Sequence, residues 1–323
     1  MEKVRWGIIG LGSIANSFAS VFEAENAELI AAASRSLQKA QEFTKKYNIP
    51  KAYGNYGALI HDPDVDAVYI ATPNTHHISV IKRALEAGKH VFCEKAMFVN
   101  QKELDEAVAL AEENNVLLAE AMTIYHMPLY KKLKQLIEDG TLGKVKMVHA
   151  LFGSLKDPDP SNRFFSKELG GGALLDVGVY ALSFVRYFLS SQPHNIKTVA
   201  NLYPTGVDEQ SSVLLKNKDD EIGTVSMAFR SKMPKMGLIV GEEGYITVND
   251  YPRASQAILT RPDGSTETIS EGSTSEGLNY EIQAFTRTIL TGKDETFFHL
   301  TKDVTQIMDT LSKEWGMDLS LDE

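Results

Sequence analysis

The chain has 323 residues, of which 43% are hydrophobic and 24% are charged, as in an ordinary water-soluble protein. This length exceeds what one hydrophobic core usually fills, so we expect two domains. The formal net charge of −10 argues against nucleic acid or an anionic membrane as a main partner. The single cysteine, Cys93, excludes an internal disulfide and fits a reducing compartment. No leader-like segment precedes the first predicted strand and no apolar run approaches membrane-spanning length, so we expect a cytoplasmic protein.

The first predicted strand, Val4–Ile9, leads directly into the turn Gly10-Leu11-Gly12-Ser13-Ile14-Ala15. This is the Gly-x-Gly-x-x-Gly/Ala pattern between an apolar strand and an amphipathic helix, predicted over residues 14–25. Gly10 permits the tight turn, and Gly12 lets the backbone approach a pyrophosphate. The N–H groups at the start of the helix, from Ser13 and Ile14 onward, favour an anion. The turn therefore predicts a dinucleotide site.

The rest of the first 120 residues alternates between strand and helix patterns, which indicates βαβ units and a parallel sheet. The further strands are predicted at 29–34, 65–71, 90–93 and 116–119. Ser36 is expected to cap the helix after the second strand, and Asn74 or Thr75 the helix that Gly88 ends. A last helix is predicted over 103–114.

The pattern changes from about residue 122, where a helix is predicted over 129–138. Strand patterns with hairpin-type turns follow at 144–152, 197–203, 211–215, 223–229, 238–240, 245–249 and 256–260. Helices over 280–290 and 301–315 end the chain, and we expect them to pack on the first domain. The sequence thus predicts an α/β Rossmann domain over residues 1–121. An α+β domain with an open-faced, mostly antiparallel sheet is predicted over 122–323.

The end of the second predicted strand bears on the choice of dinucleotide. In NAD-binding versions of this fold an acidic residue there binds the adenosine ribose, but this chain has Ser34-Arg35-Ser36 and no carboxylate. Arg35 and the two serines can bind a 2′-phosphate, and Lys39 adds charge one turn later. We therefore expect NADP rather than NAD. The alternative is that Arg35 and Lys39 are only solvated residues at a helix start.

Three segments arrive at the carboxyl ends of the predicted strands, where ligands bind in such sheets: residues 72–77, Glu94-Lys95 and residues 120–122. Lys95 is the strongest catalytic candidate, because an ammonium beside a nicotinamide can stabilise negative charge on a substrate oxygen. The alternative is a surface lysine paired with Glu94.

The segment Gly170–Tyr180 opens a helix in which almost every side chain from Ala173 to Leu189 is apolar, and its Asp176 and Tyr180 lie four residues apart on one face. A carboxylate there needs a cation, and Lys95 is the natural candidate. The other reading is a core helix in which Asp176 and Tyr180 are satisfied by the protein. His76 and His77 are adjacent, which is not metal-ligand spacing, so we expect no metal site. One of these histidines can line the cofactor cleft, but capping or packing explains them equally well.

These motifs together resemble the Gfo/Idh/MocA oxidoreductases over nearly the full chain. The residues that carry the resemblance are Gly10–Ala15, Ala71–His77, Cys93-Glu94-Lys95 and Gly170–Tyr180, in this order and spacing. The resemblance implies a Rossmann domain followed by an open-faced sheet that pairs with its copy in a homodimer or dimer of dimers. It implies Lys95 as a catalytic residue, with Asp176 and Tyr180 in the substrate site.

Two departures from the family pattern carry information. Many members have Pro where Ala96 stands, and many have His where Tyr180 stands. Tyr180, with Ser34-Arg35-Ser36, Asn162-Arg163-Phe164-Phe165 and Glu120-Ala121-Met122, looks most like the NADP-dependent dimeric dihydrodiol dehydrogenase and D-xylose dehydrogenase branch. By this resemblance alone, Arg163 lies near the active site. The cofactor contacts we expect are with Gly10, Gly12, Ser13, Ile14, Ser34, Arg35, Ser36, Lys39, Thr72, Asn74, His77, Glu94, Lys95 and Arg163.

The sequence thus predicts reversible hydride transfer between NADP and a hydroxyl-bearing carbon of a sugar, polyol or dihydrodiol. In oxidation Tyr180 would accept the hydroxyl proton with help from Lys95, and Asp176 would orient Lys95 and bind a substrate hydroxyl. Alternatively, Lys95 itself carries the proton and Tyr180 positions the substrate. A non-catalytic NAD(P)-binding sensor or scaffold is the rival from another class, and metal-dependent hydrolysis is a weaker third.

Overall fold

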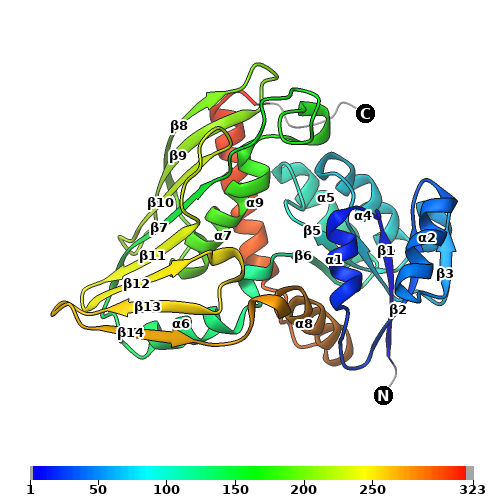
Figure 1. Ribbon diagram of the computed structural model, residues 1–323, viewed down its shortest axis with the longest axis horizontal. Helices are drawn as coiled ribbons and strands as arrows, with labels where there is room; N and C mark the ends of the chain where they lie inside the picture. Colours follow the sequence, from blue (N-terminus) through cyan, green and yellow to red (C-terminus); the bar gives the residue numbers. More distant parts are fainter. Residues whose placement is uncertain (1–2, 318–323) are drawn as a thin grey trace. The chain divides into compact units, whose positions relative to one another are not determined.

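The computed structural model describes residues 3–317, which divide into two compact units (Figure 1). Unit 1 comprises residues 1–122 and 278–298, and unit 2 comprises residues 123–277 and 299–323. Of the two helices near the end of the chain, α8 (Gly277–Thr291) therefore belongs almost wholly to unit 1. The last helix, α9 (Phe298–Glu314), belongs to unit 2.

Unit 1 is a doubly wound parallel sheet of six strands in the order β3-β2-β1-β4-β5-β6. The strands are β1 (Val4–Ile9), β2 (Ala27–Ala33), β3 (Lys51–Tyr53), β4 (Ala67–Ile70), β5 (His90–Glu94) and β6 (Leu118–Ala121). Its other helices are α1 (Ser13–Val21), α2 (Leu37–Tyr47), α3 (Tyr56–Ile60), α4 (His77–Glu86) and α5 (Gln101–Glu113). Strand order reverses between β1 and β4, the place where such sheets bind ligands.

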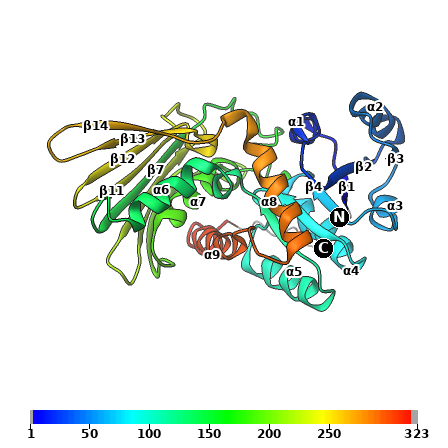
Figure 2. The ribbon, with the colours of Figure 1, turned by 90° about the horizontal axis from the view of Figure 1, so that it is seen from below.

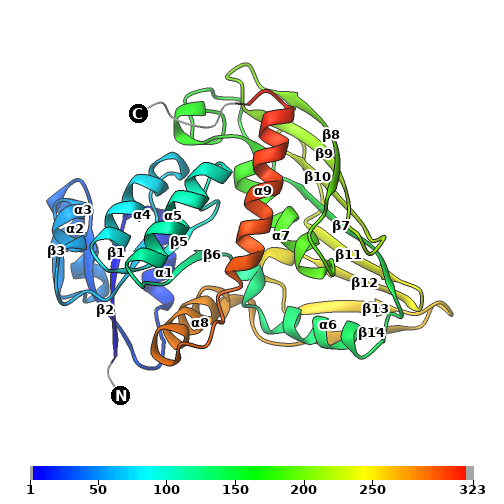
Figure 3. The ribbon, with the colours of Figure 1, turned by 180° about the vertical axis from the view of Figure 1, so that it is seen from behind.

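Each face of this sheet buries its own apolar cluster. One cluster joins the sheet to α1, α2 and α8 around Trp6, which is fully buried against Phe18, Phe92 and Phe285. The other joins the sheet to α3, α4 and α5. Figures 1 and 3 show the two sides, with α1 in front in one view and α4 and α5 in front in the other. Helices on both faces explain why the strands are apolar on both faces.

Unit 2 is an eight-stranded sheet in the order β14-β13-β12-β11-β7-β10-β9-β8. Its strands are β7 (Val145–Gly153), β8 (Asn195–Leu202), β9 (Asp208–Lys216), β10 (Ile222–Ala228), β11 (Met236–Gly241), β12 (Gly244–Asn249), β13 (Gln256–Thr260) and β14 (Thr266–Ser270). The helices α6 (Pro128–Glu138), α7 (Val179–Phe188) and α9 lie along one face, as Figures 1 and 2 show. No helix of unit 2 among the described residues covers the other face.

Helix α7 packs unusually close to the sheet because glycines face it. A side chain at Gly237 would overlap the ring of Phe184, and one at Gly223 would lie 2.6 Å from Val185. A turn of π-helix over Leu174–Gly178 precedes α7 and continues its axis. The helix that carries Asp176 and Tyr180 is thereby fixed against the centre of the sheet.

The predicted α/β class, with a Rossmann sheet followed by a mostly antiparallel sheet, is confirmed. Strand β1 has the predicted bounds, whereas α1 ends at Val21, four residues earlier than predicted. The pair β7–β10 is parallel, which hairpin-type turns did not predict. The expected cap at Asn74 or Thr75 is wrong, because residues 74–76 form a 3₁₀ turn and α4 begins after it with no side-chain cap.

The expectation that no apolar run approaches membrane-spanning length needs correction. Among the described residues, the helical stretch Lys167–Phe188 is long and apolar enough to cross a membrane. However, 78% of its most apolar window is buried inside the protein, as is typical of a core helix.

Candidate active site

The glycine turn after β1 stands at the point where the strand order of unit 1 reverses. Gly10 has φ +89°, and a Cβ there would lie 2.7 Å from the carbonyl oxygen of Ala71, so only glycine fits. The backbone N–H of Ala71 donates to the carbonyl of Ile9 at 2.8 Å, which joins the ends of β1 and β4. The turn and the loop after β4 thus form one edge of the sheet.

The N-terminus of α1 fits an anionic group. Gly12 caps this helix without a side-chain hydrogen bond, and the first turn has no acidic residue. A Cβ at Gly12 would meet no protein atom within 4 Å, so the space beside its backbone is open. Partial positive charge and N–H groups therefore face open space, which is what a pyrophosphate requires. The residues present fit a dinucleotide.

The turn after β2 contains hydroxyl and cationic groups and no carboxylate. Ser34 is buried, and its hydroxyl accepts a hydrogen bond from the N–H of Ser36 at 3.3 Å. Ser36 caps α2 as predicted, accepting from the N–H of Lys39 at 3.3 Å. Arg35 and Lys39 are exposed. These hydroxyl and cationic groups can bind a phosphate.

His77 contacts the backbone of two loops of unit 1. Its side chain is fully buried, with Nδ1 3.0 Å from the carbonyl oxygen of Ala96 and Nε2 2.8 Å from that of Thr72. Both ring nitrogens face backbone carbonyls, and the contact of His77 with the cofactor stays a prediction. His77 thus joins the loop after β4 to the loop after β5. Burial lowers the pKa of His77 to about 4, so the ring is neutral at pH 7.

The loop that carries Lys95 is fixed on both sides by buried carboxylates. The hydroxyl of Tyr69 donates to Glu94, and Glu120 accepts from the N–H of Met97 at 3.0 Å. Both glutamates are nearly inaccessible to solvent, whereas Lys95 is partly exposed. The peptide bond between Lys95 and Ala96 is cis. These buried contacts hold the backbone of the turn that carries Lys95.

In unit 2 every residue from Gly170 to Leu189 is buried except Asp176 and Tyr180, which are partly exposed. Their spacing places them on about the same face of the helix. The guanidinium of Arg163 lies 3.7 Å from the carboxylate of Asp176 and packs over the ring of Phe164 at 4.4 Å. The structure therefore brings Arg163 and Asp176 together within unit 2. Lys95 belongs to unit 1, and its pairing with Asp176 of unit 2 stays a prediction.

The ring of Tyr180 borders an aromatic group on the sheet that was not predicted. Its centroid lies 6.3 Å from that of Phe152, which also contacts Tyr251 at 6.1 Å. The ammonium of Lys235 sits 5.1 Å from the centre of the Phe152 ring. Burial, and secondarily Tyr180, raises the pKa of Tyr251 well above its usual value. A sequence signal existed only for Phe152, which occupies an inward position of the predicted strand.

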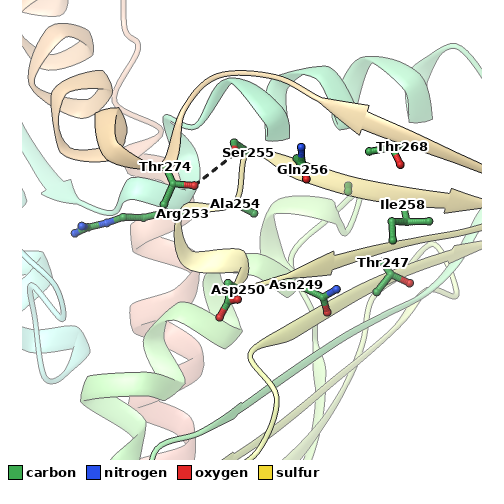
Figure 4. A pocket seen from close by; sticks show the side chains of 11 residues that line it. Thr247, Asn249, Asp250, Arg253, Ala254, Ser255, Gln256, Ile258, Thr268 and Thr274 are labelled. Carbon is green, nitrogen blue, oxygen red and sulfur yellow. Dashed lines mark hydrogen bonds between the residues drawn. The ribbon is translucent and has the colours of Figure 1, made fainter.

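A groove of about 320 Å³ near the other end of the sheet is a different feature. Figure 4 shows it between β12, β13 and the turn at Asp250–Ala254, with side chains such as Asn249, Gln256 and Thr268 around it. The neighbours Val248 and Leu259 are buried and lie on the opposite face of the sheet, along which the helices of unit 2 lie (Figure 3). The groove therefore lies on the helix-free face and is separate from Asp176 and Tyr180.

Comparison with known families matches both units of the chain. Residues 4–122 match the oxidoreductase family with an NAD-binding Rossmann fold, and residues 130–247 match the Gfo/Idh/MocA C-terminal domain. A trans-1,2-dihydrobenzene-1,2-diol dehydrogenase of Danio rerio is 33% identical, and the match covers 99% of both chains. The chain belongs to the Gfo/Idh/MocA oxidoreductase family. The Mus musculus enzyme of the same name is 37% identical over 75% of this chain and 73% of its own.

Solved structures of this family share the fold. A 3-ketoreductase of Actinomadura kijaniata, in complex with NADP and TDP-benzene, has a TM-score of 0.84. It is 25% identical, and the match covers 96% of this chain and 97% of the ketoreductase. A levoglucosan dehydrogenase in complex with NADH and levoglucosan has a TM-score of 0.88 at 21% identity, over 98% of both chains. Both nicotinamide cofactors therefore occur on this fold, and this member is an NAD(P)-binding oxidoreductase.

The buried position of His77 predicts a pH-dependent contribution to the stability of unit 1. The pKa of His77 is about 4 in the folded chain against an ordinary value of 6.5, so the unfolded chain binds more protons between these values. Stability from this group is present above pH 6.5 and falls as the pH drops toward 4. We expect His77→Asn to destabilise unit 1 at pH 7, and this difference to shrink by about 2 kcal/mol at pH 5.

The measurement is urea unfolding at both pH values in a Trp315→Phe background, so that the buried Trp6 reports on unit 1. The exposed His61 offers the control, because His61→Asn should leave the pH dependence unchanged. A gap between wild type and His77→Asn that stays constant from pH 7 to pH 5 would contradict the assignment.

Proposed function

We propose that this chain is an NADP-dependent dehydrogenase that transfers hydride to or from a hydroxyl-bearing carbon of a diol, sugar or polyol. The observation that carries the proposal is the exposure pattern of the helix in unit 2. A helix buried at every position but two, with a carboxylate and a phenol as the exceptions, leaves these two groups partly accessible to a ligand. Relatives named diol dehydrogenases at 33–37% identity support the substrate class.

Each proposed residue has a defined role in the reaction. Tyr180 accepts the hydroxyl proton of the substrate in oxidation and returns it in reduction. Lys95 stabilises the negative charge that develops on that oxygen and favours loss of the phenolic proton. Asp176, held beside Arg163, binds a neighbouring substrate hydroxyl and orients Lys95. When bound, the nicotinamide supplies or accepts the hydride.

NADP is the proposed cofactor because of the turn after β2. Ser34, Arg35 and Ser36 stand where an acidic residue would repel a 2′-phosphate, and the first turn of α2 has no acidic residue. Gly10, Gly12, Ser13 and Ile14 would hold the pyrophosphate at the N-terminus of α1. Thr72, Asn74, Glu94 and Lys95 are proposed for the nicotinamide half, and Arg163 remains a proposed neighbour of that half.

The cofactor assignment predicts the effect of reversing charge at Arg35. We expect Arg35→Asp to weaken NADP binding by about 10- to 100-fold and to improve NAD binding, since it removes a charge-assisted contact and adds repulsion. Titration of each cofactor by fluorescence measures both constants. Lys45→Asp makes the same change of charge in the last turn of α2 and should leave both constants within about twofold. Unchanged NADP affinity in Arg35→Asp would refute the assignment.

If Tyr180 is the proton acceptor, its removal should lower kcat without changing the affinity for NADP. Tyr180→Phe should lower kcat by about 10²- to 10⁴-fold with NADP affinity retained, because only the proton acceptor is lost. Tyr187→Phe, at a buried tyrosine of the same helix, is the matched control and should leave kcat nearly unchanged. If Tyr180→Phe keeps near-full kcat while Lys95→Met does not, Lys95 carries the proton. If NADP binds and no diol, aldose or inositol yields NADPH, the chain is a sensor or scaffold instead.

We further propose a homodimer through the helix-free face of the sheet. Strand pairing places Val199, Leu214, Ile222, Tyr245 and Ile258 on this face, with exposed fractions from 37% to 72%. A broad face with several exposed apolar side chains marks a protein interface, and a second copy offers the same surface. We expect Leu214→Glu to raise the dimer dissociation constant by about 10- to 100-fold, because each copy buries a carboxylate.

Light scattering after size exclusion measures this constant across a dilution series. Leu37→Glu is the control, since Leu37 is equally exposed but lies on α2 in unit 1. A wild-type chain that is monomeric at all concentrations would disprove the dimer without bearing on the enzyme.

A further inference from the structure

The N-terminus of the helix in unit 2 is held by a carboxylate from a distant strand. Asp208 begins β9, is fully buried, and accepts the N–H of Leu174 at 3.1 Å and 2.9 Å with its two oxygens. Leu174 is the first residue of the π-helical turn that contains Asp176. Asp208 therefore satisfies N–H groups that a residue just before the helix would ordinarily cap.

The glycines before this helix make the contact possible. Gly172 has φ +110°, and a Cβ there would lie 2.5 Å from the Oδ1 of Asp208. The N–H of Gly172 donates to the carbonyl of Phe164 at 2.8 Å, next to Arg163. The same carboxylate thus fixes the end of the helix and borders the loop that pairs with Asp176.

The rest of the helix is held by apolar contacts toward the sheet and by polar contacts at its far end. A side chain at Gly178 would overlap the sulfur of Met227, and one at Gly223 would lie 2.6 Å from Val185. Toward the C-terminus of the helix, Ser183 accepts a hydrogen bond from the hydroxyl of Tyr125 at 3.0 Å, and Arg186 pairs with Asp303 at 2.8 Å. The charge-assisted hydrogen bond to Asp208 holds the opposite end, at the turn that carries Asp176.

We propose that Asp208 is a positioning residue for the reaction: by anchoring the N-terminus of the helix, it sets the axial position of Asp176 and Tyr180. This inference rests on the proposed function, because it concerns the same two side chains. Asp208 touches neither substrate nor cofactor in this role. The helix dipole and the N–H groups both favour its ionised form.

The ionisation of Asp208 falls within the working pH range. Burial raises the pKa of Asp208 to about 7, against the lowering effect of the N–H groups of Leu174, Ala173 and Asp208 itself. The charged side chains on the segments packed against it are Asp176 and Arg186 on the helix, Glu209 and Lys216 on β9, Lys197 on the paired strand β8, and Arg163, Lys167 and Glu168 on the loop. The anchor should therefore strengthen as the pH rises through neutrality.

The first experiment tests whether Asp208 anchors the helix, and it does not depend on enzyme activity. Amide hydrogen exchange of residues 171–178, followed by mass spectrometry, compares wild type with Asp208→Ala and Asp208→Asn. We expect exchange to be about tenfold faster in the alanine variant and intermediate in the asparagine variant, which keeps one acceptor oxygen. Glu209→Gln, at the partly exposed next residue, is the control and should exchange like wild type. Unchanged exchange in Asp208→Ala overturns the proposal.

The second experiment tests the consequence for turnover. Displacement of Tyr180 by a fraction of an ångström should lower kcat by about 10- to 100-fold in Asp208→Ala, with NADP affinity within about twofold of wild type. Asp208→Asn should restore part of this loss and remove from the kcat profile the ionisation near pH 7 that Asp208 contributes. Faster exchange with unchanged kcat overturns the positioning role.

Two further outcomes distinguish failure of the Asp208 anchor from failure of the proposed function. If Asp208→Ala does not fold, the comparison of Asp208→Asn with Glu209→Gln decides, and equal exchange and equal pH profiles overturn the proposal. If wild type oxidises no diol or sugar, the proposed function fails, while the exchange result still decides whether Asp208 anchors the helix.

Discussion

The first N–H groups of a helix have no acceptor within the helix, and the candidate site depends on how this chain satisfies them. In α2, α3 and α5 the preceding Ser36, Asn55 and Asn100 accept an N–H of the first turn. In α4 and α6 a 3₁₀ turn and a proline start the helix instead. At α1 the cap is glycine, no side chain closes the end, and open space lies beside it. An N-terminus left in this way suits an anionic ligand, and the pyrophosphate of the proposed cofactor is one.

In unit 2 the N–H groups at the start of a helix are satisfied by the protein itself and are not left open. The helix with Asp176 and Tyr180 starts deep in the protein, where water cannot reach its N–H groups, so the chain must supply an acceptor from elsewhere. Asp208 does so across 34 residues of sequence. Of the three glycines before the helix, Gly172 follows from this contact, since a side chain there would displace the carboxylate. One helix end is open for a ligand, and the other is closed to hold side chains in place.

Much of the fold and of the candidate site could be predicted from the sequence, because the patterns that indicate them lie within short segments. The strand, turn and helix at Val4–Ala15 indicate their conformation through alternation and glycine spacing, and the isolated Asp176 and Tyr180 stand out in an apolar run. The strands β3 and β14 were missed for different reasons. Lys51–Tyr53 is too short for any period to show, and Thr266–Ser270 is a polar edge strand with only Ile269 buried. The roles of His77 and Asp208 were beyond reach, since each depends on carbonyl or N–H groups of segments distant in sequence.

Two buried groups, His77 and Asp208, change the stability of their units in opposite directions as the pH falls. His77 has a folded pKa below its unfolded value, so its contribution to unit 1 is lost as the pH falls from 6.5 toward 4. Asp208 has a folded pKa of about 7 against an ordinary value of 3.8, so the folded chain holds a proton that the unfolded chain has released between these values. Stability from that group therefore rises as the pH falls from 7 toward 4, although the ionised form anchors the helix better. For Asp208, the pH range in which the carboxylate best accepts the N–H groups of the helix is thus higher than the range in which this group contributes most to the stability of unit 2.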